Sequence, residues 1–187
     1  MKQKERIVNW PNFFTTLRVI ITFVIVYAVF TDVSIFSIAV LFVIGMITDA
    51  IDGNIARIWN MKTEFGRRYD QFADRFLLVA TVISFMVHYP MTGYFGREQI
   101  YQMFIMLARE IVGFPFAVAY FILSKHWTPH ATHIAKATTV LQAIALPAIV
   151  FKMSIAWPFA ITTGIIGAFS ALNYIRDLKE VYRKRGL

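Results

Sequence analysis

The sequence predicts an all-α integral membrane protein with six transmembrane helices. Apolar residues make up 58% of its 187 residues and charged residues only 16%, against roughly 45–50% and about 25% in soluble domains. A helix needs about 20 mostly apolar residues to cross a hydrocarbon core of roughly 30 Å, so six crossings with short connections account for the whole chain. We therefore expect one membrane-embedded domain over residues 1–187 and no separate soluble domain.

Six apolar stretches follow one another along the chain, separated by short segments rich in turn or interface residues. Trp10 and Pro11 precede the first stretch and suit an interfacial anchor and a helix start, so residues 1–12 are expected to lie along the membrane surface. The first stretch lacks a small-residue cleavage site and is interpreted as a retained helix. A basic tail over residues 176–187 follows the last stretch and suits anionic lipid. The six stretches are residues 13–30, 33–58, 66–88, 99–124, 133–151 and 157–175.

The basic residues predict how the spans are oriented. The net charge of +8 comes from 19 Lys and Arg against 11 Asp and Glu, and cytoplasmic loops of membrane proteins are enriched in Lys and Arg. If the N-terminus is cytoplasmic, fifteen basic residues fall inside and two, Arg97 and Lys152, fall outside, while Arg18 and Arg109 lie within spans. Both termini are therefore expected in the cytoplasm, and the positive charge is attributed to anionic lipid instead of nucleic acid. The fifteen are Lys2, Lys4, Arg6, Arg57, Lys62, Arg67, Arg68, Arg75, Lys125, Lys136, Arg176, Lys179, Arg183, Lys184 and Arg185.

Four aspartates lie inside the apolar stretches, close to the expected cytoplasmic side. Asp49 and Asp52 are three residues apart near the end of the second stretch, and Asp70 and Asp74 are four apart near the start of the third. Each spacing places its pair on one helical face. Because a short inner connection joins these two helices, we expect antiparallel neighbours whose acids share one pocket. A charge inside a span costs at least ~2.5–3.5 kcal/mol near the centre, so the quartet is a candidate functional site.

Four carboxylates in one pocket of low dielectric constant stay ionised only if cations balance them. Ligand sets made of oxygen alone favour hard divalent cations, and two Mg²⁺ or Mn²⁺ ions would match the four charges. Paired ions about 3.5–4 Å apart are typical of displacement at phosphorus, which predicts a phosphate-ester substrate. The alternatives are a structural ion-pair network with Arg57, Arg67 and Arg68, or a small ion or metal carrier.

The acids and the small residues between them resemble the signature of the CDP-alcohol phosphotransferases, membrane enzymes of phospholipid synthesis. The signature covers Asp49-x2-Asp52-Gly53-x2-Ala56-Arg57-x8-Gly66-x3-Asp70-x3-Asp74. The resemblance implies transfer of the phosphatidyl group from CDP-diacylglycerol to an alcohol, with release of CMP, in the bacterial inner membrane at a site open to the cytoplasm. Members of the family often form homodimers.

The resemblance also implies a role for each residue of the signature. Two divalent cations, Mg²⁺ or Mn²⁺, would be held by Asp49, Asp52, Asp70 and Asp74. Asp74 would in addition act as the general base on the acceptor hydroxyl. The CDP group would be bound by Asp49, Gly53, Ala56 and Arg57.

Three shorter motifs resemble the bacterial phosphatidylglycerophosphate synthases of this family. The resemblance implies glycerol 3-phosphate as the acceptor, with its phosphate bound by Arg109 and Lys136. Gln71 and Arg75 replace the Pro and Lys usual in those synthases, so inositol phosphate, or phosphatidylglycerol giving cardiolipin, stays open as the acceptor. The roles of Arg18, Glu110, His126, His130 and His133 are open as well. The motifs are Pro11-Asn12-x2-Thr15-x2-Arg18, Ala108-Arg109-Glu110-Ile111 and Lys136-Ala137-Thr138-Thr139.

Overall fold

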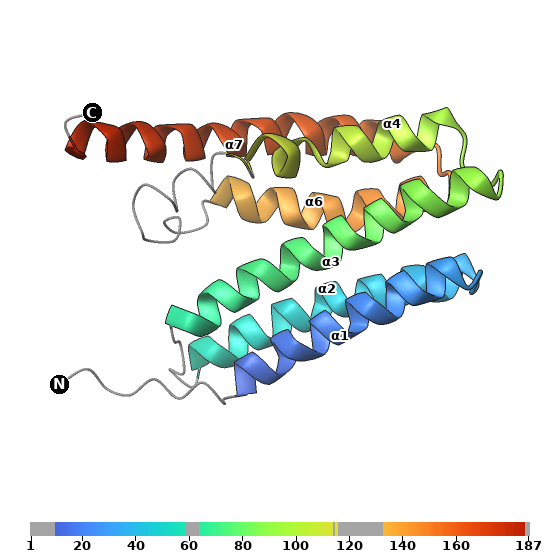
Figure 1. Ribbon diagram of the computed structural model, residues 1–187, viewed down its shortest axis with the longest axis horizontal. Helices are drawn as coiled ribbons and strands as arrows, with labels where there is room; N and C mark the ends of the chain where they lie inside the picture. The colour runs from blue at the N-terminus through green and yellow to red at the C-terminus, as the bar shows by residue number, and fades with distance from the viewer. Residues whose placement is uncertain (1–9, 59–63, 114, 116–132, 186–187) are drawn as a thin grey trace. The chain divides into compact units, whose positions relative to one another are not determined.

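The computed structural model describes residues 10–58, 64–113, 115 and 133–185, and at some positions in these ranges it describes the backbone without the side chain. Every regular element in these ranges is an α-helix (Figure 1). The contacts divide the chain into two compact units, Met1–Thr92 and Gly93–Leu187. The expected all-α fold is confirmed for the part of the chain that is described.

Three helices form the first unit: α1 (Trp10–Phe30), α2 (Ile35–Ile58) and α3 (Glu64–Met91). They lie side by side, and α1 packs against both of the others, whereas α2 and α3 touch less (Figure 1). The side chains of Ile25, Phe42 and Leu77, one from each helix, are almost fully buried. Packing of these apolar side chains between the helices holds the unit together, and α1 contacts both of the helices that were expected to form the site.

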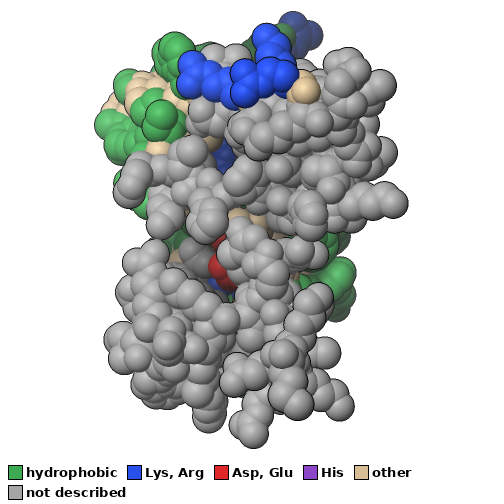
Figure 2. All heavy atoms as spheres, turned by 90° about the vertical axis from the view of Figure 1, so that its left-hand side faces the viewer, with side chains coloured by type: hydrophobic (Ala, Val, Ile, Leu, Met, Phe, Trp, Pro, Cys, Tyr) green, Lys and Arg blue, Asp and Glu red, His purple; other side chains and the backbone are tan. Residues whose placement is uncertain are grey.

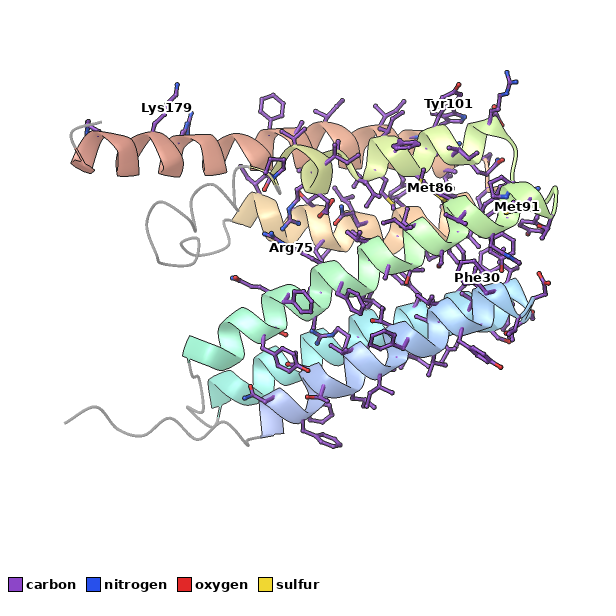
Figure 3. The ribbon with its side chains drawn as sticks, in the orientation of Figure 1. Phe30, Arg75, Met86, Met91, Tyr101 and Lys179 are labelled. Atoms are coloured by element: carbon purple, nitrogen blue, oxygen red, sulfur yellow. The ribbon has the colours of Figure 1, made fainter. Side chains whose placement is uncertain are left out.

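A tight turn joins α1 to α2. Asp32 has a φ of 55°, a left-handed conformation that Asp tolerates better than most residues. The Val33 amide donates to the Ala28 carbonyl at 3.0 Å and so closes the end of α1. Asp32 Oδ1 also lies 2.8 Å from His88 Nε2, and the His88 ring packs edge-on to Phe30, which Figure 3 labels at the end of α1. These contacts fix the ends of α1 and α3 against each other.

The second unit contains α4 (Arg97–Met106), a helical segment at 108–113, α6 (His133–Val150) and α7 (Ala156–Arg185). α6 and α7 pack along each other, and α4 contacts both. Gly164 of α7 allows a close approach to α4, because a Cβ atom there would lie 2.7 Å from the Ile105 carbonyl oxygen. Small residues have this role in many helix pairs of membrane proteins.

The helices follow the predicted stretches, with two differences. The stretch 99–124 was expected as one span, but α4 ends at Met106 and Leu107 turns with φ −82° and ψ 5° before helix resumes at 108. The expected tail over 176–187 is helical as far as Arg185, because α7 continues through it. Its basic residues Arg176, Lys179 and Arg183 are exposed.

Two helical stretches within the described residues, Asn12–Phe30 and Tyr69–Met91, are long and apolar enough to cross a bilayer. Three others are apolar but shorter: Ile35–Thr48, Ala137–Val150 and Ala156–Ser170. The six crossings and their orientation therefore stay predictions.

Candidate functional site

Asp70 and Asp74 form the described part of the acidic site. They lie one turn apart near the start of α3, which places them on one face of the helix, as their spacing predicts. Both bond to the same guanidinium group: Arg18 Nη1 donates to Asp70 Oδ1 at 2.9 Å and to Asp74 Oδ1 at 2.6 Å. The Arg18 side chain is fully buried, whereas the two carboxylates are 35% and 28% exposed. The arginine therefore lies on the inner side of the acid pair.

Arg18 also joins the acid pair to α2. Its Nε donates to the Gly45 carbonyl at 3.3 Å, and the Thr48 hydroxyl donates to the same oxygen at 2.7 Å. A Cβ atom on Gly45 would meet Leu77 of α3 at 2.9 Å, so a glycine at this position lets α2 and α3 approach closely. One side chain of α1 thus contacts both partner helices at the depth of the acids.

The other predicted residues of the acidic site have side chains outside the described residues. This applies to Asp49, Asp52, Ala56 and Arg57, and the backbone of these four residues and of Gly53 is part of α2. Asp49 follows Gly45 by one helical turn, so its backbone is close to the carbonyl that Arg18 contacts. The ion-pair alternative named Arg57, Arg67 and Arg68, whose side chains are likewise outside the described residues. The described ion pairs of Asp70 and Asp74 are with Arg18, and the alternative with the other three arginines stays a prediction.

The donor set of the described acids fits a hard divalent cation. Each carboxylate has two oxygens, of which the Oδ1 atom bonds to Arg18. Carboxylate oxygens are the ligands that Mg²⁺ and Mn²⁺ prefer. The described carboxylates of Asp70 and Asp74 therefore offer the type of ligand atom that such a cation requires.

A second polar cluster lies in the other unit, between the segment 108–113 and α6. Arg109 Nη1 donates to Thr139 Oγ1 at 3.1 Å, and Arg109 Nε lies 3.9 Å from Glu110 Oε1. Lys136 lies one turn before Thr139 on α6, with its side chain outside the described residues. Arg109 and Lys136 are the two cations predicted to bind the acceptor phosphate. Arg109 contacts Thr139 directly, and the backbone of Lys136 lies one helical turn from Thr139.

Glu110 is held by a glutamine that the sequence analysis did not identify. Gln142 Nε2 donates to Glu110 Oε2 at 2.8 Å and to the Met106 carbonyl at 3.2 Å, and Gln142 is 1% exposed. A buried amide that bonds both to a carboxylate and to the last residue of α4 fixes the bend at Leu107 against α6. The sequence shows Gln142 as a polar residue within an apolar stretch, but it does not show that Gln142 contacts Glu110 and Met106, which lie 32 and 36 positions away.

Gly167 of α7 is a further residue of this cluster. A Cβ atom at Gly167 would lie 2.9 Å from Arg109 Cβ and 3.4 Å from its backbone nitrogen. α7 therefore packs directly against the backbone of Arg109. The sequence offers only a small residue in an apolar helix as a signal for this contact.

The exposed basic residues of α7 lie away from both clusters along the chain. Figure 2 shows blue Lys and Arg side chains gathered on the surface, and Figure 3 shows Lys179 pointing outward from α7. Such a surface suits anionic lipid headgroups. His126 and His130 are outside the described residues, as is the His133 side chain.

The chain matches the family model described as CDP-alcohol phosphatidyltransferase over residues 8–172. It is 28% identical over 174 residues to the CDP-diacylglycerol–glycerol-3-phosphate 3-phosphatidyltransferase of Escherichia coli (strain K12), an alignment that covers 89% of this chain and 93% of the relative. The protein of the same name from Shigella flexneri serotype 5b is 30% identical over 149 residues, 79% of each chain. That from Rickettsia felis is 38% identical over 80 residues, 42% of this chain and 44% of the relative.

Proposed function

Because the chain belongs to the CDP-alcohol phosphatidyltransferase family, we propose that it transfers the phosphatidyl group of CDP-diacylglycerol to glycerol 3-phosphate, giving phosphatidylglycerol phosphate and CMP. Family membership and the apolar helices make it a membrane protein that acts in phospholipid biosynthesis. We further propose one catalytic domain with six crossings, both termini in the cytoplasm of a bacterial cell, and an active site open to that side. This orientation is supported by the excess of basic residues in the expected inner segments.

The acids of the first unit are proposed to bind the donor through divalent ions. Asp49, Asp52, Asp70 and Asp74 would hold two ions, Mg²⁺ or Mn²⁺, and Gly53, Ala56 and Arg57 would contact the CDP group together with Asp49. When bound, the ions would neutralise the charge on the diphosphate oxygens during attack by the acceptor. The described carboxylates on one face of α3 support this assignment. The acyl chains can stay in the bilayer while the nucleotide enters from the water phase.

Asp74 is proposed as the general base of the transfer. The acceptor hydroxyl loses its proton as its oxygen attacks the β-phosphorus that carries the diacylglycerol, and CMP leaves. A carboxylate accepts that proton, and Asp74 is partly exposed whereas its Oδ1 atom is held by Arg18. The hydrogen bond from Arg18 fixes the orientation of the carboxylate that is proposed to accept this proton.

The Arg109 cluster is the observation that supports glycerol 3-phosphate most directly. Arg109 donates to the neutral hydroxyl Thr139 Oγ1 and lies 3.9 Å from Glu110 Oε1, and Lys136 lies one helical turn before Thr139 on α6. Two cations around a phosphate dianion make strong charge-assisted hydrogen bonds. The three relatives are each named for glycerol 3-phosphate as the acceptor, which supports the same choice.

An acceptor screen tests the proposal. Purified protein is mixed with CDP-diacylglycerol, Mg²⁺ and one acceptor at a time, and CMP release is measured. We expect release with glycerol 3-phosphate and little with inositol phosphate or phosphatidylglycerol. If CMP were released only with inositol phosphate or only with phosphatidylglycerol, that compound would be the acceptor and the assignment of glycerol 3-phosphate would be wrong. No release with any acceptor would favour the ion or metal carrier.

A further inference from the structure

Arg18 is a fully buried charge in the middle of a long apolar helix. Its side chain is 0% exposed, and it lies within Asn12–Phe30, a stretch apolar enough to cross a bilayer. Such a charge is costly unless it is paired, and in membrane proteins it marks a functional position by default. The proposed function described above assigns no role of its own to Arg18.

The described contacts of Arg18 with Gly45, Asp70 and Asp74 use the shape of the guanidinium group. Nε donates to the Gly45 carbonyl on one side, while Nη1 donates to the Oδ1 atoms of Asp70 and Asp74 on the other. The guanidinium donors are fixed in one plane. The hydrogen bond to the Gly45 carbonyl of α2 therefore orients the guanidinium group, and the guanidinium group in turn orients the carboxylates of Asp70 and Asp74. A lysine would bring the same charge but would place its donors on one rotating ammonium group.

We propose that Arg18 is a positioning residue of the acidic site: by holding one oxygen of Asp70 and one of Asp74, it fixes the rotation of both carboxylates and sets the affinity of the protein for its divalent ions. This inference rests on the proposed function, because it takes these acids as metal ligands. Arg18 touches neither substrate nor ion in this role. Partners that orient metal ligands in this way typically change metal affinity about 10–100-fold when they are lost.

A role in charge balance alone gives opposite expectations. In that case Arg18 would only reduce the repulsion between two buried acids, and any cation at that position would do the same. Arg18→Lys would then bind metal as the unchanged protein does. Arg18→Met would bind it more tightly, because a cation that repels the metal would be gone.

The experiment measures Mn²⁺ binding by electron paramagnetic resonance. Full-length protein is purified in detergent, stripped of metal and titrated without donor or acceptor, so that acceptor identity does not enter the result. We expect Arg18→Lys and Arg18→Met both to weaken Mn²⁺ binding by about 10-fold or more. Arg18→Lys that binds as tightly as the unchanged protein, or Arg18→Met that binds more tightly, would overturn the inference.

Ile25→Ala is the matched control. Ile25 is fully buried on α1, two turns beyond Arg18, and is an aliphatic residue in the core of the first unit. Its truncation leaves a cavity and lowers the melting temperature, but it should leave the Mn²⁺ affinity unchanged. If Ile25→Ala weakened Mn²⁺ binding as much as Arg18→Lys, the effect would belong to general destabilisation and the inference would fail.

A kinetic measurement separates positioning from loss of fold. In CMP release, Arg18→Lys should need about 10-fold more Mn²⁺ for half-maximal rate, with the KM for the acceptor unchanged. A raised acceptor KM at an unchanged Mn²⁺ requirement would contradict the inference. If Arg18→Met does not fold, Arg18→Lys still decides, because it keeps the charge and most of the volume.

The outcomes keep this inference apart from the proposed function. If the unchanged protein binds no Mn²⁺, the metal site of the proposed function fails, and this inference fails with it. If the unchanged protein and Arg18→Lys bind Mn²⁺ equally, only the role of Arg18 is lost.

Discussion

The two units hold their buried polar groups by different means. In the first unit, the guanidinium of Arg18 on α1 joins two carboxylates of α3 to a carbonyl of α2. In the second unit, a hydroxyl and an amide hold Arg109 and Glu110, with the two charges 3.9 Å apart. Both clusters contain hydrogen bonds with an ionised donor or acceptor, which are stronger than hydrogen bonds between two neutral groups. The acids of the first unit are thus held by a charged partner, whereas Arg109 and Glu110 of the second unit are held by neutral groups as well as by each other.

The largest effect is expected for Asp74→Asn in the first unit. The amide keeps an oxygen for Arg18 but cannot accept a proton, so kcat for CMP release should fall about 10²–10⁴-fold. The protein should still fold and bind CDP-diacylglycerol, as measured by melting temperature and by equilibrium binding of the donor. Asp32→Asn is the control, because Asp32 pairs with His88 at the opposite end of α3. Turnover that persists in Asp74→Asn would remove its role as the base.

The second prediction concerns the cations of the other unit. Arg109→Ala and Lys136→Ala should each raise the KM for glycerol 3-phosphate by about 10–100-fold, since a hydrogen bond to a charged group contributes about 1.5–3 kcal/mol. The KM for the donor should change little. Lys152→Ala is the control, because Lys152 lies 4.4 Å from the centre of the Tyr94 ring, on the loop before α7. An unchanged acceptor KM in both variants would exclude this phosphate site.

Gln142→Leu should weaken the second unit without touching the substrate. Leucine has a similar size but leaves Glu110 Oε2 and the Met106 carbonyl without this donor, which costs about 1–3 kcal/mol of unfolding free energy. We expect a lower melting temperature and a few-fold rise in acceptor KM, because Glu110 adjoins Arg109.

Gln102→Leu is the matched control for Gln142→Leu. Gln102 of α4 is also buried, at 3% exposure, but its Oε1 atom has no hydrogen-bond partner among the described residues. Replacing an unsatisfied polar group by an apolar one is close to neutral or stabilising. Equal melting temperatures for the two variants would mean that the Gln142 bond adds nothing to stability.

The smallest effect is expected for Gly167→Ala on α7. The added methyl group would meet Arg109 Cβ at 2.9 Å and should displace the arginine by a few tenths of an ångström. We expect the acceptor KM to rise about two- to five-fold, which corresponds to ~0.4–1 kcal/mol. Gly96→Ala serves as the control, because the nearest atom to its Cβ is Gln99 Oε1 at 3.5 Å. If Gly167→Ala changed the KM for the donor more than the KM for the acceptor, the proposed location of Gly167 beside the acceptor site would be contradicted.

The sequence predicted the helices well because apolar stretches of this length leave the backbone no other way to satisfy its hydrogen bonds in a membrane. α1, α2 and α3 each contain the predicted stretch or most of it, and the helical spacing of Asp70 and Asp74 fixed their common face. The partner of these acids was not predictable, since Arg18 is 52 and 56 positions away. Periodicity describes one helix at a time, and this contact depends on how three helices pack. The break at Leu107 escaped prediction because no Gly or Pro marks it.

The most direct test of the central claim is CMP release from metal-depleted protein. Protein stripped with a chelator and assayed with CDP-diacylglycerol and glycerol 3-phosphate should release almost no CMP, and Mg²⁺ or Mn²⁺ should restore the rate. The account requires this result, since the aspartates of α2 and α3 are assigned to bind the donor through divalent ions. Release at the full rate from protein without divalent ions would contradict it.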